Sequence, residues 1–165
     1  MECVANTLLK RAAEDLKVAK KLAQHPELGD SVVGFYLQQV VEKSLKVALA
    51  IRDVKFPMMA HDLEFLLTLT AGHDIKPPPE VIGAGWLTPW GTTYENAEAS
   101  PGVLNHRAAF EVGEAAIRWA EGMLAEAGDS PVPQTSSCRT PPPPPQPTQG
   151  LGRPETGAEP SSRGG

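Results

Sequence analysis

The chain has 165 residues, which is room for one domain of ordinary size and an appendage. Its 15 Lys and Arg residues are outnumbered by 20 Asp and Glu residues, and the formal charge of -5 argues against a protein that wraps duplex nucleic acid. The first residues do not read as a secretory signal, and no apolar run approaches the roughly 20 residues of a membrane span, so we expect a soluble, cytoplasmic protein.

The first two predicted helices run from Ala5 to Ala23 and from Val33 to Arg52, with a break at Pro26 and Gly29 between them. Both segments repeat apolar residues at steps of three and four, the spacing of an amphipathic helix. The apolar stripe of the second segment comprises Leu37, Val40, Val41, Leu45, Ala48 and Leu49. Its other face carries Gln38, Gln39, Glu42, Lys43 and Lys46. That polar face either is simply exposed to solvent, or it is part of a surface that pairs with another chain or lines a cleft.

A third, shorter helix is predicted to start with Asp62 as its N-cap and to end at Gly72. The pattern over residues 77–104 mixes apolar residues with Gly and Pro, and it does not decide between one helix, two helices and a loop. The last helix ends near Gly128 and shows a clear stripe of Phe110, Gly113, Ile117, Ala120 and Leu124. No alternating run is typical of a strand, so the fold class is all-α.

The composition changes at residue 129, where Pro, Gly, Ser, Thr and Gln become dominant and Pro141 to Pro145 are consecutive. Val132 and Leu151 are the large apolar residues of this segment, too few to offset the entropy of ordering it. We therefore divide the chain into a helical domain at residues 1–128 and a disordered Pro-rich C-terminal tail at residues 129–165.

Residues 35–49 read FYLQQVVEKSLKVAL, an aromatic pair followed by Gln-Gln, two apolar residues, Glu-Lys and Leu-Lys. This order resembles the second-helix signature of HEPN domains (higher eukaryotes and prokaryotes nucleotide-binding). Ala60-His61-Asp62-Leu63 and Ala13-Glu14-Asp15-Leu16 add to the likeness. The resemblance implies an antiparallel four- to five-helix up-and-down bundle that pairs as a homodimer. In bacteria it implies a minimal nucleotidyltransferase partner in a two-component, toxin-antitoxin-like system.

Some members of the family cut RNA with an Arg that is followed four to six residues later by His. Here Arg52 and His61 stand farther apart, with Phe56-Pro57 between them, so that motif is not found. The related branch of the family carries Arg-Tyr-Pro in the fourth segment, where this chain has Thr93-Tyr94-Glu95. Because Thr cannot grip a phosphate as Arg does, this departure argues against RNA cleavage and tight nucleotide binding.

Six residues are candidates for contact with a ligand or for the wall of a cleft: Gln38, Glu42, Lys46, His61, Asp62 and Tyr94. His61 is the one weak catalytic candidate, as a general base oriented by Asp62; alternatively, the two residues cap the third helix. The Tyr94 hydroxyl contacts a ligand, or its ring is simply buried. His61-Asp62 and His73-Asp74 lack the spacing typical of a metal site, so no metal is expected.

Three functions stay open. The first is a dimeric binding module that docks a nucleotidyltransferase or similar partner, and it is our preferred hypothesis, without enzymatic activity. The second is a metal-independent ribonuclease toxin, for which RNA would be the substrate. The third is a domain that binds ATP or GTP as a cofactor. Its phosphates would be bound by Lys43, Lys46, Arg52 and Lys55.

Overall fold

The computed structural model describes residues 2–93 and 101–129, and these residues form helices without a strand. The elements are α1 (Glu2–Leu22), the 3-10 helix η1 (Pro26–Leu28), α2 (Asp30–Ile51), α3 (Leu63–Gly72), α4 (Pro79–Ile82), the 3-10 helix η2 (Ala84–Leu87), α5 (Thr88–Thr93) and α6 (His106–Asp129). The all-α prediction is confirmed. The disordered tail was predicted to begin at residue 129, but Asp129 is the last residue of α6; residues 130–165 lie outside the described residues.

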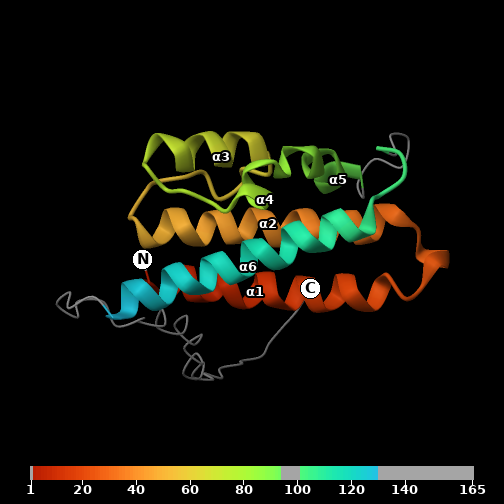
Figure 1. Cartoon of the computed structure of the whole chain (residues 1–165), viewed down its shortest axis with the longest axis horizontal. Coiled ribbons are helices and arrows are strands. Elements are labelled where there is room, and N and C mark those ends of the chain that lie inside the picture. Colours follow the sequence, from red (N-terminus) through yellow and green to blue (C-terminus); the bar gives the residue numbers. More distant parts are fainter. Residues whose placement is uncertain (1, 94–100, 130–165) are drawn as a thin grey trace, which may run out of the picture. The chain divides into compact units, whose positions relative to one another are not determined.

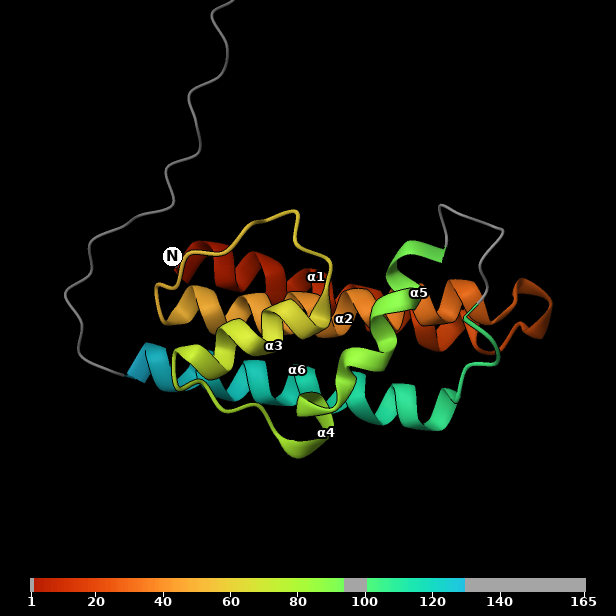
Figure 2. The same ribbon diagram turned by 90° about the horizontal axis from the view of Figure 1, so that it is seen from above.

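The three long helices lie side by side, with α1 antiparallel to both α2 and α6 (Figures 1 and 2). The segment from α3 to α5 covers one side of α2 and returns the chain to the end of the bundle at which α6 begins (Figure 1). This segment occupies the position of the third helix of an up-and-down bundle, but it consists of several short helices instead of one long helix. Within residues 2–93 and 101–129, every helix is too short or too polar to span a lipid bilayer.

The third helical position is broken because its sequence does not allow a continuous helix. Pro79 and Glu80 open α4, Gly83 closes it, and the 3-10 turn of η2 then leads directly into α5. Pro fits the first turn of a helix, but it cannot supply the backbone donor that the interior of a helix needs. The undecided segment at residues 77–104 is therefore a chain of short helical turns as far as Thr93.

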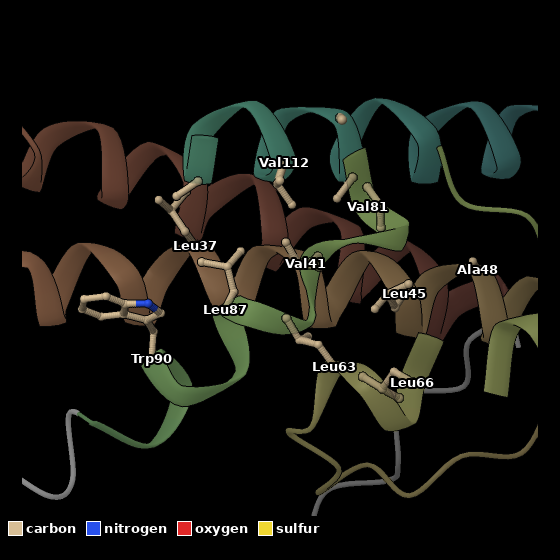
Figure 3. Packing of buried hydrophobic residues seen from close by; sticks show 14 of the residues in the cluster. Leu37, Val41, Leu45, Ala48, Leu63, Leu66, Val81, Leu87, Trp90 and Val112 are labelled. Carbon is tan, nitrogen blue, oxygen red and sulfur yellow. The ribbon is translucent and has the colours of Figure 1, made fainter. Parts of the chain in front are cut away.

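The core lies between α2 and the elements that surround it (Figure 3). Its buried side chains include Leu37, Val41, Leu45, Leu63, Leu66, Val81, Leu87, Trp90 and Val112. Five residues of the predicted α2 stripe lie in this cluster: Leu37, Val41, Leu45, Ala48 and Leu49. The sixth, Val40, packs with Ile117 of the α6 stripe in a smaller cluster, and Ala120 of α6 lies in another. Burial of such side chains supplies about 1.5 to 3 kcal/mol each, which makes these clusters the main source of stability.

The polar face of α2 is also covered, because α3 and α5 pack on the helix as well as α1 and α6. Gln38, Glu42 and Lys46 are all at most 3% exposed, so they are as buried as the leucines of the opposite face. A solvated polar face, one of the two alternatives from the sequence, is therefore wrong. Gln39 and Lys43 of this face are partly buried, and all five side chains are hydrogen-bonded to other groups of the protein.

Candidate functional site

The carboxylate of Glu42 is the centre of a group of polar side chains that we call the α2 polar cluster: Gln38, Gln39, Glu42, Lys46 and His61. Glu42 Oε1 accepts a hydrogen bond from Lys46 Nζ at 2.7 Å. Glu42 Oε2 lies 3.1 Å from His61 Nδ1, 3.2 Å from Gln38 Nε2 and 3.3 Å from Gln39 Nε2. Gln38, Glu42 and Lys46 share one side of α2 because they are four residues apart.

The α2 polar cluster holds the loop that joins α2 to α3. Lys46 Nζ donates to the carbonyl oxygen of Met58 at 2.7 Å, and Gln38 Nε2 donates to that of His61 at 2.8 Å. These two bonds give buried donors a partner and give irregular backbone a fixed position on the helix. Two residues of the second-helix motif, Gln38 and Lys46, therefore attach the loop to α2. The spacing of the motif in the sequence does not reveal this role.

Lys43 ties the neighbouring helix to the same region. Its Nζ donates to Asp15 Oδ2 of α1 and to Gln39 Oε1, both at 2.7 Å. The Asp15 and Lys43 side chains are 20% and 17% exposed, so this pair is partly shielded from water. Asp15 belongs to the short first-helix motif at residues 13–16. Its ion pair with Lys43 therefore joins the first-helix motif to the second-helix motif.

The buried charges of the α2 polar cluster are stable only when each of them has all of its hydrogen-bond partners. Removing a buried ion pair from water costs several kcal/mol per ion, which the attraction of the two charges offsets only if further hydrogen bonds satisfy both groups. The Lys46 and Glu42 side chains are each 3% exposed and have such further bonds. Among the described residues, no buried side-chain nitrogen or oxygen lacks a hydrogen-bond partner.

His61 is the only exposed member of the cluster, with half of its side-chain surface open to solvent. The carboxylate that faces its ring belongs to Glu42, which lies 19 positions away in sequence. Asp62 instead caps α3, because its Oδ1 accepts from the backbone N–H groups of Glu64 at 2.9 Å and Phe65 at 3.4 Å. The helix-capping alternative is thus confirmed for Asp62, and Asp62 is not the carboxylate on His61.

A family model described as the HEPN domain matches residues 5–129, which is most of the chain. The chain belongs to the HEPN domain family. No curated protein and no solved structure matches it. The family predicted from the second-helix motif is confirmed, and in this HEPN domain the motif residues are those that form the α2 polar cluster.

The other candidate residues of this HEPN domain are dispersed. Tyr94 lies outside the described residues. His61 and His73 flank opposite ends of α3, so the two His-Asp pairs do not converge, and the described residues contain no group of three metal-ligating side chains. Of the cations considered for a nucleotide, Lys43 and Lys46 are engaged in ion pairs. Arg52 follows the end of α2, ten residues and roughly 15 Å along the axis from Glu42.

Arg52 borders a groove that the sequence did not indicate. The groove has a volume of about 430 Å³ and brings Arg52 together with Lys76, with Arg118 and Trp119 of α6, and with the acidic Asp74 and Glu126. Because its lining contains both acidic and basic groups, the groove has no uniform charge that would select an anion. Trp119 is partly buried and packs against the core.

A second polar contact closes the opposite end of the bundle. Asp30, the first residue of α2, accepts a hydrogen bond from the backbone N–H of Leu104 at 2.9 Å and lies 2.7 Å from His106 Nε2. The hydrogen bond with His106, followed by that with Leu104, holds the pKa of the Asp30 carboxyl below its ordinary value of 3.8, although burial opposes the shift. This contact fixes the start of α6 on the start of α2.

Proposed function

We propose that this HEPN domain is a helical binding module that forms a homodimer and acts with a minimal nucleotidyltransferase or similar protein partner in a two-component, toxin-antitoxin-like system. The observation that carries the proposal is the presentation of two apolar side chains by an anchored loop. Met58 and Met59 are 55% and 80% exposed, although the carbonyl of Met58 is hydrogen-bonded to the buried Lys46.

An anchored loop with exposed methionines favours binding of another protein. A loop held at two backbone positions loses little conformational freedom when a partner docks, so less of the binding energy is spent on ordering it. Methionine is enriched at protein interfaces and adapts its shape to an apolar partner. Family membership adds the expected kind of partner, because HEPN domains resembling this one act beside nucleotidyltransferases.

The geometry gives less support to a ribonuclease. The Arg-to-His arrangement of the cleaving relatives requires a cation near the histidine, where negative charge develops on the phosphate. Arg52 instead borders the groove beside α6, whereas His61 contacts the middle of α2. The cation nearest to His61 in the cluster, Lys46, is buried and already donates to Glu42 and Met58.

The proposal is tested first by sequencing the genes beside this chain's gene, where a minimal nucleotidyltransferase is expected. The full chain and that protein are purified separately, and their binding is measured by calorimetry, with the oligomeric state of the chain measured by light scattering. Met58→Ser with Met59→Ser should weaken binding by about tenfold or more, since a buried apolar anchor contributes over 1 kcal/mol. Ile82→Ser is the matched control, because Ile82 is 58% exposed but lies on α4.

Two results would count against the binding module. The first is full-affinity binding by the double methionine variant with reduced binding by Ile82→Ser, which would place the interface elsewhere. The second is cleavage of tRNA or mRNA by the purified chain that disappears in His61→Ala, since this would make the protein a ribonuclease.

A further inference from the structure

The environment of His61 differs from that of the other three histidines, all of which lie in the described residues. His25 Nδ1 faces Glu27, whose side chain is 68% exposed, and His73 Nδ1 faces the backbone carbonyl of Leu69. His106 contacts Asp30 through Nε2. Only His61 combines a half-exposed ring with an Nδ1 that faces a buried carboxylate, that of Glu42.

The contact with Glu42 determines which nitrogen of His61 is the reactive one. A carboxylate oxygen only accepts hydrogen bonds, so in the neutral ring the proton sits on Nδ1 and is donated to Glu42 Oε2. The lone pair then sits on Nε2. The carboxylate also stabilises positive charge on the ring, and it is held in place by Lys46, Gln38 and Gln39.

We propose that His61 is a phosphoryl-accepting residue, with Nε2 as the nucleophile toward a small phosphoryl donor that has a good leaving group. The Nε2 lone pair forms a bond to phosphorus, while the bond from phosphorus to the leaving group breaks and its electron pair departs with that group. Nδ1 keeps its proton. The phosphorylated ring is therefore cationic, and its Nδ1–H stays hydrogen-bonded to the carboxylate of Glu42, whose other oxygen pairs with Lys46.

The rest of the cluster suits this role because it needs no rearrangement. Glu42 already faces Nδ1 in the unmodified protein, so the stabilising charge is in place before the phosphoryl group arrives. The His61 backbone is fixed by Gln38, which limits the motion of the ring. The modification would place a dianion in the loop that presents Met58 and Met59, yet this inference does not depend on what that loop binds.

The test uses phosphoramidate as the donor and the full-length chain. The site of modification is mapped by peptide mass spectrometry, and the modified nitrogen is identified by ³¹P NMR. His73 is the internal comparator, because its Nδ1 faces a neutral carbonyl instead of a carboxylate. We expect His61 to be modified at Nε2 and about tenfold faster than His73, the margin typical of a charge-assisted over a neutral hydrogen bond.

A variant separates the carboxylate effect from simple exposure. Glu42→Gln keeps the shape of the side chain and removes its charge, so modification of His61 should slow to the rate of His73, provided that circular dichroism shows the helices intact. If this variant unfolds, the comparison of the two histidines within the unaltered chain decides. Equal rates at His61 and His73, or attachment at Nδ1 of His61, would overturn the proposal.

Discussion

Gly91 of α5 lies directly against the side chain of Gln38 on α2, so closely that a Cβ atom at Gly91 would be 2.7 Å from Gln38 Cδ. Real Cβ atoms essentially never approach another atom to this distance. The missing side chain at position 91 thus gives the amide of Gln38 the space that it needs to reach the carbonyl of His61.

Gly91→Ala should therefore destabilise the domain, because the new methyl group displaces Gln38 and weakens its bond to the loop. We expect a loss of about 1 to 3 kcal/mol in the free energy of unfolding, the cost typical of overpacking. Urea denaturation followed by circular dichroism measures it. Gly122→Ala is the control, since a Cβ there meets no atom within 4 Å, and it should be neutral or slightly stabilising. Equal effects of the two substitutions would contradict this account.

Gly34 and Gly113 both face core side chains, but an added Cβ atom would have less space at Gly34 than at Gly113. A Cβ at Gly34 would lie 2.9 Å from Cγ of the buried Trp90 ring and closer still to other ring atoms, whereas one at Gly113 would lie 3.3 Å from a terminal methyl of Leu37. A rigid ring cannot move aside as a leucine methyl can. Gly34→Ala should lower the midpoint of thermal unfolding more than Gly113→Ala, and the reverse order would show that α5 does not pack on α2 as described.

Lys46→Met should cost about 3 to 5 kcal/mol of stability, because it leaves the carboxylate of Glu42 buried without its cation. Lys20→Met removes a cation from an ion pair with Glu114 in which both side chains are largely exposed, and it should cost about 1 kcal/mol or less. Denaturant unfolding of the two variants provides the comparison. Adding Glu42→Leu to Lys46→Met should restore part of the lost stability, and a failure to restore any would mean that Glu42 is not the group left unpaired.

The stability of the domain should depend on pH through Asp30. Since the hydrogen bonds with His106 and Leu104 lower the pKa of this carboxyl in the folded protein, its ionised form stabilises the fold above the ordinary value of 3.8. That contribution is lost as the pH falls through the lowered pKa. Asp30→Asn should thus be less stable than the parent at pH 7, with a difference that shrinks in acid. A difference that stays constant from pH 7 to pH 3 would rule out this linkage.

Much of the bundle could be predicted because the relevant signals are local. The three- and four-residue spacing in α1, α2 and α6 depends only on which side of each helix is buried, and Asp62 caps α3 through backbone groups two and three residues away. The structure extends the predicted starts by a few residues, from Ala5 to Glu2 in α1 and from Val33 to Asp30 in α2.

The site was predicted less fully, since its contacts join distant parts of the chain. Gln38, Glu42 and Lys46 could be identified, together with Gln39 and Lys43, as the polar face of one helix. That they are buried could not be predicted, because part of their cover is α5, which belongs to a Pro- and Gly-broken segment whose helicity the sequence left open. The pairing of Glu42 with His61 was hidden in the same way, and the adjacent Asp62 was the more obvious but incorrect choice.

Because other elements cover α2 on all sides, its backbone amides should be protected from hydrogen exchange with water. The residues from Leu45 to Ala50, in the C-terminal half of α2, are all buried under other elements, so we expect local fraying not to expose their amides. Amide hydrogens there should exchange with deuterium only when the whole domain opens, whereas those of α3, with its single covered side, should exchange through smaller fluctuations. The protection measured along α2 would then report the global stability of the domain.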